Sequence, residues 1–482
     1  MLATRPLSGS RRTATIKRMQ FAPLRLGRGL PPVTVLTLAV ILFSAFVRLD
    51  EATDSALARE SVGSVRGAMV AANGQTIVSS APSGEPQISL PGLAPIVGYR
   101  DPAGRWHGLE GAYESVLSGE SRRHGLGAFF AHLTGHSIQG GNLNLTIEPF
   151  LQRVAAAALG AHRGAVVALD PRTGAVLAIV SSPSCNPSVL ATPAGYRHCS
   201  ADPHKPLLDR PIDFLGAPGS SFKIVTLTAA LDTETFQLDT VFSGADIFGP
   251  SPYFDNSEYP SNITTPGFTA LTLSQALAFS DNFTFAHIGI VLGSNVLRRY
   301  ARRYYIGRRI PFDLRVAVSH TLAGLANPST AVLAQSSFGA PTDMVTPLQM
   351  AIIAETVANG GVAMRPFIVR SEELNGAVVA TTKPEALGRV MSPASASNVT
   401  EAMSFVVNHG SGYAAQISGI QVAGKTGTAA SGRDKPNAWF IAFAPADHPR
   451  IAVAVLKQFS GEGATAAAPI ARKVILAALG KS

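Results

Sequence analysis

Metal-binding patterns are absent from this sequence. Its 482 residues include only two cysteines, and neither an H-E-x-x-H pattern nor a cysteine cluster occurs. His132 and His136 stand four positions apart, but no third ligand lies near them in the sequence, so they are more simply interpreted as surface histidines. We therefore expect no metal centre and no other cofactor.

The two cysteines, Cys185 and Cys199, are separated by fourteen positions. In an oxidising compartment such a pair could close a disulfide around a short loop. Two unlinked thiols are the equal alternative, because a sequence does not give the distance between them.

Charge is scarce in this chain: 15% of residues are charged and 46% are hydrophobic. This composition excludes a disordered chain and provides for a sizeable core. The length fits one large domain and a small one, and no internal repeat is evident.

Acidic residues are missing from the N-terminus. Residues 1–29 carry seven of the Lys and Arg residues and no Asp or Glu, which accounts for most of the net charge of +9. The rest of the chain is close to neutral and has no basic stripe that could follow a phosphate backbone. We therefore expect no nucleic-acid partner.

Residues 29–47 contain no charge. As a helix they would span about 29 Å, close to the hydrocarbon thickness of a bilayer. We assign 1–29 as a basic cytoplasmic tail and 30–48 as a single transmembrane anchor, with the rest of the chain extracytoplasmic. The alternative is a cleaved secretory signal, for which Ala56-Leu57-Ala58 has the right form but follows three acidic residues.

The remaining residues divide into a small module, 49–141, and a large domain, 142–482. In the module, Asn73-Gly74 between two apolar runs predicts a hairpin. In the large domain the patterns predict strands and helices at both ends of the segment and helices in its middle, which indicates an α+β fold with one sheet built from both ends. The predicted strands are 164–169, 175–180, 420–423, 438–444 and 451–456, and the predicted helices begin at 149, 220, 272, 346 and 467.

Three short motifs follow one another in the large domain. Ser220 and Lys223 stand three residues apart at the start of an apolar helix, which gives a hydroxyl and an amine a shared pocket. Alone, this pair is better interpreted as two polar residues at a helix start, with Ser220 as the N-cap. Two further motifs follow, Ser280-Asp281-Asn282 and Lys425-Thr426-Gly427-Thr428. In this order, the three form the signature of penicillin-recognising serine enzymes.

The sequence here resembles the penicillin-binding protein transpeptidases over about residues 142–480. Further likenesses are Thr173-Gly174 in a first hairpin, Thr346-Pro347 at a late helix and Arg66-Gly67 in a pedestal typical of monofunctional, class B members. The resemblance implies a five-stranded antiparallel sheet flanked by helices, as in serine β-lactamases. One departure is Gly339-Ala340-Pro341, where the family often has Gly-Gln-Gly.

The resemblance also implies roles. Ser220 would be the nucleophile, Lys223 its base and Ser280 a proton relay, while Asn282 would hold the substrate amide. Lys425, Thr426, Gly427 and Thr428 would bind the substrate carboxylate. The backbone N–H groups of Ser220 and Thr428 would form an oxyanion hole. The implied partners are peptidoglycan stem peptides, β-lactam antibiotics and a membrane glycosyltransferase.

Other functions remain open at this point. A D,D-carboxypeptidase would use the same residues with water as acceptor. A β-lactamase would need a Glu to activate water, and none stands in a convincing position. An antibiotic sensor would need a signalling domain, for which the short tail has no room. From another class, Gly419 to Thr426 also matches the P-loop of nucleotide hydrolases, although the residues after Thr428 predict a turn instead of the required helix.

Overall fold

The computed structural model of the protein describes residues 66–81, 84–119, 139–244 and 269–481. Among these residues, no helix combines the length and the apolar character of a membrane span. The predicted tail at 1–29, the predicted anchor at 30–48 and the two histidines at 132 and 136 lie outside the described residues.

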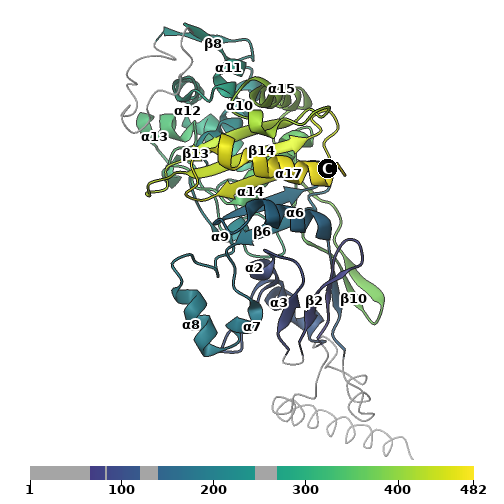
Figure 1. Cartoon of the computed structure of the whole chain (residues 1–482). Coiled ribbons are helices and arrows are strands. Elements are labelled where there is room, and N and C mark those ends of the chain that lie inside the picture. Colours follow the sequence, from purple (N-terminus) through teal and green to yellow (C-terminus); the bar gives the residue numbers. More distant parts are fainter. Residues whose placement is uncertain (1–65, 82–83, 120–138, 245–268, 482) are drawn as a thin grey trace, which may run out of the picture. The chain divides into compact units, whose positions relative to one another are not determined.

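A five-stranded antiparallel sheet forms the centre of the large domain (Figure 1). Its strand order is β13-β14-β15-β5-β6, so two strands from early in the chain pair with three from its end. The predicted sheet built from both ends is therefore confirmed. The strands are β5 (Gly164–Leu169), β6 (Val176–Ser182), β13 (Ala423–Ala429), β14 (Asn437–Ala444) and β15 (Ile451–Lys457).

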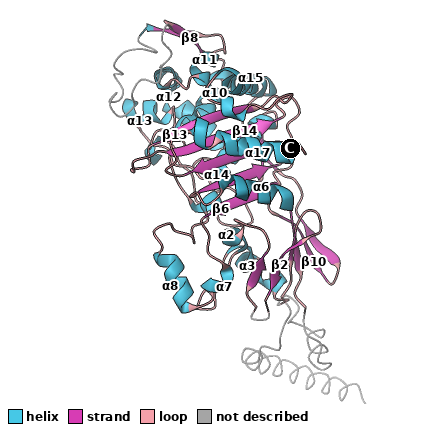
Figure 2. Ribbon diagram, viewed as in Figure 1, coloured by secondary structure: helices cyan, strands magenta, loops and turns pink. Residues whose placement is uncertain are grey.

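Helices cover both faces of this sheet (Figure 2). Along β5, Val166 and Ala168 pack with α6 and α17, while Ala165, Val167 and Leu169 face the core that contains α10 and α14. Successive strand residues point to opposite faces, so a strand buried on both sides is apolar throughout. The four helices are α6 (Pro149–Leu159), α10 (Lys223–Asp232), α14 (Pro347–Ala358) and α17 (Ala468–Ala478).

The remaining helices of the large domain surround α10 or lie in connecting segments. Helix α10 buries every residue from Lys223 to Leu231, which requires neighbours on all sides. These helices are α7 (Pro187–Leu190), α8 (Pro193–Ala201), α9 (Arg210–Asp213), α11 (Leu273–Ala278), α12 (Asn282–Arg303), α13 (Thr330–Ser336), α15 (Pro393–His409) and α16 (Gly463–Ala466).

A second sheet, of six strands, has the order β11-β10-β4-β1-β2-β3. The predicted hairpin at Asn73-Gly74 joins β1 and β2. Strands β4, β10 and β11 come from beyond residue 141, so the predicted boundary at 141–142 passes through a sheet. The strands are β1 (Met69–Val70), β2 (Thr76–Ser80), β3 (Pro86–Ile88), β4 (Asn142–Leu145), β10 (Val369–Leu374) and β11 (Ala377–Thr381).

Short helices and strand pairs complete the described residues. Three helices precede β4: α2 (Ala94–Val97), α3 (Gly108–Ala112) and α4 (Glu114–Leu117). Two pairs of strands stand apart from the sheets: β7 (Val241–Ser243) with β8 (Ala270–Thr272), and β9 (Val362–Met364) with β12 (Ala386–Arg389).

The structure corrects one strand and answers one open question. The strand predicted at 420–423 instead runs from Ala423 to Ala429, because Ile420 bridges back to Ile417 in a turn. The Lys-Thr-Gly motif is thus inside the strand. Cys185 and Cys199 form a disulfide with their Cα atoms 6.4 Å apart.

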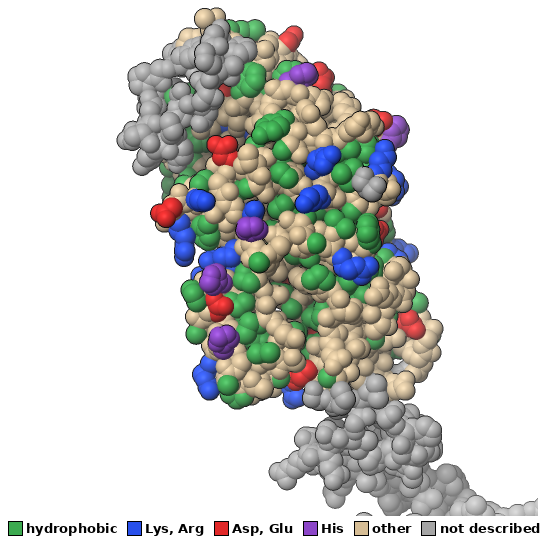
Figure 3. Space-filling model, viewed as in Figure 1, with side chains coloured by type: hydrophobic (Ala, Val, Ile, Leu, Met, Phe, Trp, Pro, Cys, Tyr) green, Lys and Arg blue, Asp and Glu red, His purple; other side chains and the backbone are tan. Residues whose placement is uncertain are grey.

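Charged side chains are dispersed over the face shown in Figure 3. Lys and Arg stand singly or in small groups among apolar and neutral side chains there. That face presents no continuous basic stripe.

Candidate active site

Ser220 lies on a single 3₁₀ turn, Gly219–Phe222, that leads directly into helix α10. The sequence predicts an α-helix from Ser220 onward, so the tighter first turn is a correction. In a 3₁₀ helix, side chains three residues apart eclipse one another. This geometry aligns Ser220 with Lys223, and the Nζ of Lys223 lies 3.0 Å from the Oγ of Ser220.

Two glycines bring this turn against strand β13. Gly219 has φ +56°, and a Cβ on it would lie 2.5 Å from the carbonyl oxygen of Thr428. A Cβ on Gly427 would collide with the carbonyl of Pro218. Only glycine permits this approach of two backbones. The Ser220 turn and the Lys-Thr-Gly strand therefore meet at one place.

Lys223 is fully buried and surrounded by oxygen atoms. Its Nζ donates to the Oδ1 of Asn282 and to the carbonyl of Ser280, each at 2.7 Å, and lies 3.3 Å from the Oγ of Ser280. An uncharged amine has two N–H groups and one lone pair. With the N–H groups directed to Asn282 and the Ser280 carbonyl, the lone pair is left for the hydroxyl of Ser220.

Ser280 occupies the turn between α11 and α12. Helix α11, which follows the predicted start at residue 272, begins with a capping box of Thr272 and Gln275. The Ser280 backbone is in the left-handed region, with φ 63°, a strained conformation for a residue other than glycine that is characteristic of functional sites. The Nζ of Lys425 donates to the Oγ of Ser280 at 2.9 Å, so this hydroxyl lies between two lysine side chains.

Strand β13 supplies the other predicted residues. Lys425 is fully buried and also donates to the carbonyl of Thr426 at 3.0 Å. The Oγ1 of Thr426 lies 2.7 Å from the Oγ of Ser411. The Oγ1 of Thr428 accepts from the backbone N–H of Gly463 at 3.2 Å. Lys425 thus links Ser280 to this strand, while Thr426 and Thr428 are held by neighbouring segments.

Burial changes the acid–base properties of both lysines. It lowers the pKa of Lys223 well below its usual value, and the nearby charge of Lys425 lowers it further, against the opposing charge of Asp281. Burial also lowers the pKa of Lys425, to about 7. Desolvation and a like charge both disfavour an ammonium. Lys223 is therefore suited to act as an uncharged base.

Two residues near the site were not predicted to act there. Asp281 is fully buried, and its Oδ2 accepts from the backbone N–H of Thr284, which caps α12; burial raises the pKa of this carboxyl. Its position inside the motif Ser280-Asp281-Asn282 is the sequence feature that could have indicated a role for Asp281. Ser411 follows helix α15, and its backbone N–H donates to the carbonyl of Ala278. No local pattern distinguishes Ser411 from other loop serines.

The P-loop interpretation of Gly419 to Thr426 is wrong. Lys425 and Thr426 lie within β13, which continues to Ala429 and pairs with β14 along its whole length. A P-loop must lead into a helix whose N-terminus holds phosphate. An extended strand presents no such terminus.

A family model for the penicillin binding protein transpeptidase domain matches residues 164–476. This chain belongs to the penicillin-binding protein transpeptidase family. The Peptidoglycan D,D-transpeptidase PbpA of Mycolicibacterium smegmatis is 37% identical over 413 residues, which cover 80% of this chain and 82% of the relative. The Mycobacterium tuberculosis protein of the same name is 38% identical over 420 residues, with the same coverage.

Solved structures agree with this assignment. Penicillin-binding protein A from M. tuberculosis, in its penicillin G acyl-enzyme complex, superposes with a TM-score of 0.77 at 34% identity, covering 86% of this chain and 100% of that one. Pseudomonas aeruginosa PBP2 superposes with a TM-score of 0.72 at 26% identity, covering 86% and 96%.

Proposed function

We propose that this chain is a peptidoglycan D,D-transpeptidase that acts through an ester on Ser220 and is inhibited by penicillin. The observation that carries the proposal is a buried amine, Lys223, 3.0 Å from the Ser220 hydroxyl and with its pKa lowered. The reaction is proposed from the names of the relatives. The ester intermediate is proposed from the acyl-enzyme complex of a structural neighbour.

The first step forms the ester. Uncharged Lys223 takes the proton of Ser220 as the Oγ attacks the carbonyl of the penultimate D-Ala of a donor stem peptide. A C–O bond forms and an electron pair moves onto the carbonyl oxygen. The N–H groups of Ser220 and Thr428 stabilise this oxyanion, since preorganised donors stabilise developing charge.

The second step releases the terminal D-Ala. The C–N bond breaks, and the leaving amine takes a proton from the Ser280 hydroxyl, which Lys223 replenishes. Ser280 suits this role because its Oγ lies 3.3 Å from the Nζ of Lys223 and 2.9 Å from that of Lys425. An acceptor amine then attacks the ester, with the same groups moving protons in the opposite direction.

Strand β13 and Asn282 position the donor. Lys425, Thr426 and Thr428 bind the terminal carboxylate, with Gly427 allowing the strand to lie close to the Ser220 turn. The Oδ1 of Asn282 accepts from Lys223, which directs its amide N–H groups toward a substrate carbonyl. Losing a donor to such a carbonyl would weaken binding by the energy of a hydrogen bond, about 1 kcal/mol.

Two other reactions on this fold differ in the acceptor. A D,D-carboxypeptidase would hydrolyse the same ester. A β-lactamase would need a carboxylate to activate water, but in the described part of the chain no Glu hydrogen-bonds Ser220, Lys223, Ser280 or Lys425. This counts against a β-lactamase, and the names of the relatives favour transfer to an amine over hydrolysis.

The proposal includes the location of the enzyme. Residues 1–29 form the cytoplasmic tail, 30–48 the single membrane span, 49–141 the pedestal and 142–482 the catalytic domain outside the bacterial plasma membrane. A membrane glycosyltransferase is the proposed partner, because a monofunctional transpeptidase needs another enzyme to supply glycan strands. Proteolysis of sealed vesicles would test the orientation.

Product analysis tests the reaction. The purified protein is mixed with a donor stem peptide ending in D-Ala-D-Ala and with increasing acceptor amine, and the products are separated by mass. We expect D-Ala release and an amide-linked product that grows with the acceptor. A product that is always hydrolysed, whatever the acceptor concentration, would contradict transpeptidation and favour the carboxypeptidase.

A further inference from the structure

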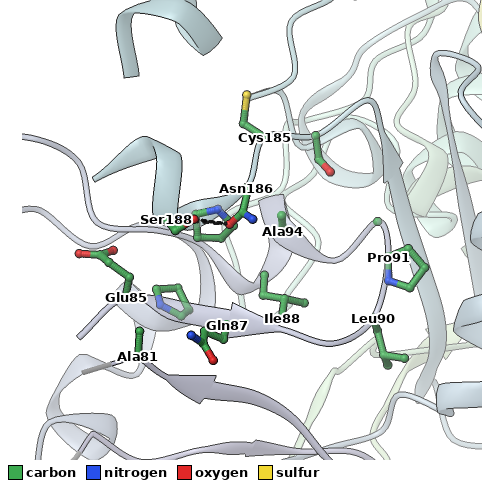
Figure 4. Close-up of a pocket in the computed structure, with 14 residues that line it drawn as sticks. Ala81, Glu85, Gln87, Ile88, Leu90, Pro91, Ala94, Cys185, Asn186 and Ser188 are labelled. Atoms are coloured by element: carbon green, nitrogen blue, oxygen red, sulfur yellow. Dashed lines mark hydrogen bonds between the residues drawn. The ribbon is translucent and has the colours of Figure 1, made fainter. Parts of the chain in front are cut away.

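A cavity of about 500 Å³ lies away from Ser220, between strand β3 and the disulfide-closed segment 185–199 (Figure 4). Glu85, Gln87 and Ile88 line it from the β3 side, and Asn186 and Ser188 line it from the other. Its size is within the range of about 300–1,000 Å³ that is typical of ligand sites. The transpeptidase chemistry makes no use of this cavity.

One buried carboxyl in this cavity has an oxygen without a hydrogen-bond partner in the described structure. Glu85 is 8% exposed, and its Oε2 accepts no hydrogen bond from any group in the described structure. Burial raises the pKa of this carboxyl. Leaving a buried carboxylate oxygen unbonded is unfavourable. A donor supplied by a ligand would remove that penalty.

The charges of Arg100 and Arg66 oppose the burial effect on the pKa of Glu85, but both guanidinium groups direct their hydrogen bonds to other acceptors. Arg66 donates to Glu110 and Glu114. Arg100 is exposed and directed to the carbonyl of Gly104. The group as a whole contains three carboxylates and two guanidinium groups: Glu85, Glu110, Glu114, Arg66 and Arg100. The region therefore favours one additional positive charge.

The remaining walls suit an aliphatic chain and a peptide group. Ile88, Leu90, Pro91 and Pro187 provide apolar surface. The Oδ1 of Asn186 accepts from both the N–H and the Oγ of Ser188, at 3.0 and 2.9 Å, as Figure 4 shows with a dashed line. With its oxygen engaged, the Asn186 side chain has only its amide N–H groups to offer, and these suit a backbone carbonyl.

We propose that this cavity binds the side chain of a lysine in an extended peptide, with the ammonium on Glu85, the methylenes along Ile88 and Pro187, and a backbone carbonyl on Asn186. The site adds a second recognition function to the chain, independent of acyl transfer at Ser220. A lysine fits better than an arginine because a single carboxylate oxygen pairs with a compact ammonium, whereas a guanidinium prefers two acceptors.

Saturation-transfer NMR on the full-length protein tests the proposal with the peptide acetyl-Ala-Lys-Ala-amide. We expect transfer to the lysine methylenes and a loss of affinity of about tenfold in Glu85→Gln, which equals about 1.4 kcal/mol. Glu385→Gln removes an exposed carboxylate from outside the cavity and is the matched control; it should bind like the wild type. A peptide with norleucine in place of lysine retains the methylenes without the ammonium and should bind about tenfold more weakly.

Folding of the variant is checked separately. Glu85→Gln keeps the side-chain shape and removes an unpaired buried charge, so its melting temperature should be unchanged or higher. Absence of transfer to the lysine peptide would overturn the proposal. Equal affinity for the norleucine peptide, or unchanged binding in a folded Glu85→Gln, would also overturn it. Penicillin acylation in Glu85→Gln should proceed at the wild-type rate, which separates this site from the proposed enzyme function.

Discussion

Two clusters of buried charged side chains differ in composition: one lies beside strand β13 and the other against helix α3. Beside β13, two lysines share the Ser280 hydroxyl, and no carboxylate of the described residues hydrogen-bonds either lysine. Against α3, Arg66 donates to Glu110 and Glu114 and stacks 4.0 Å above the ring of Trp106. One cluster joins like charges and the other opposite charges.

The two arrangements have opposite effects on protonation. Burial lowers the pKa of Lys223, and the neighbouring Lys425 adds to the effect. Burial also acts against the charge of Arg66, but its bonds to Glu114 and Glu110 outweigh burial and raise its pKa. A like-charged neighbour thus favours an uncharged amine, whereas an opposite one favours a permanent ion pair that supports structure.

The largest expected effect comes from removing the base. Lys223→Ala should lower the second-order rate of penicillin acylation by about 10³-fold, within the usual contribution of general-base catalysis. Lys223→Arg should fail similarly, because a guanidinium stays protonated. Stopped-flow fluorescence with a labelled penicillin measures both rates. An arginine variant that acylates at the wild-type rate would rule out proton transfer to Lys223.

A substitution in the ion-pair cluster around Arg66 should change the stability of the protein instead of its acylation rate. Arg66→Met leaves Glu110 buried without its partner, which typically costs about 3–5 kcal/mol. We expect a clearly lower melting temperature and an unchanged acylation rate per folded molecule. Arg172→Met is the control, since the Arg172–Asp170 pair is exposed on its arginine side and such pairs contribute less than about 1 kcal/mol. Equal melting temperatures for the two variants would contradict a supporting role for Arg66.

A smaller effect is expected in the pH profile. The carboxylate of Asp281 favours the charged form of Lys223 and so opposes the lowering of its pKa. Asp281→Asn keeps an N-cap for α12 and removes that charge, so the pKa of Lys223 should fall further. The acylation rate rises with pH as Lys223 loses its proton; this rise should therefore move to lower pH. A shift to higher pH would show that Asp281 acts in another way.

The smallest effect concerns Ser411. Ser411→Ala removes the 2.7 Å contact with the Oγ1 of Thr426 and leaves that hydroxyl free to rotate. We expect a loss of about three- to tenfold in acylation efficiency, the equivalent of roughly one hydrogen bond, mainly as weaker binding of the penicillin before acylation. Saturation kinetics separates binding from the chemical step. A loss confined to the chemical step would place Ser411 in catalysis.

That the proposed site residues lie together was easier to predict from the sequence than the segments that hold them in place. Ser220, Lys223, Ser280 and Lys425 belong to short motifs, and the structure brings all four together. The strand that carries Lys425 was placed too early, because Ile420 and Val422 alternate like a strand although tertiary pairing begins at Ala423. Strand periodicity alone does not show which residues find a partner.

The sheet built from both ends of the large domain was predicted, but most other contacts between distant segments were not. The packing of Gly219 and Gly427 joins residues about two hundred positions apart. The edge strand β11 of the six-stranded sheet comes from residues 377–381. The Cys185–Cys199 disulfide could not be decided from the sequence, because a sequence does not give the distance between two cysteines. The glycine packing, the pairing of β11 and the disulfide all depend on the three-dimensional arrangement of the chain, and local sequence patterns do not give that arrangement.

Covalent labelling tests the central claim, that Ser220 is the nucleophile, most directly. The wild type, Ser220→Ala and Ser221→Ala are treated with a fluorescent penicillin and compared after denaturation. The matched control is Ser221, whose Oγ donates to the carbonyl of Pro218 at 2.7 Å and so faces away from the reaction. We predict a stable label on the wild type and on Ser221→Ala and none on Ser220→Ala; label that persists on a folded Ser220→Ala would contradict the account.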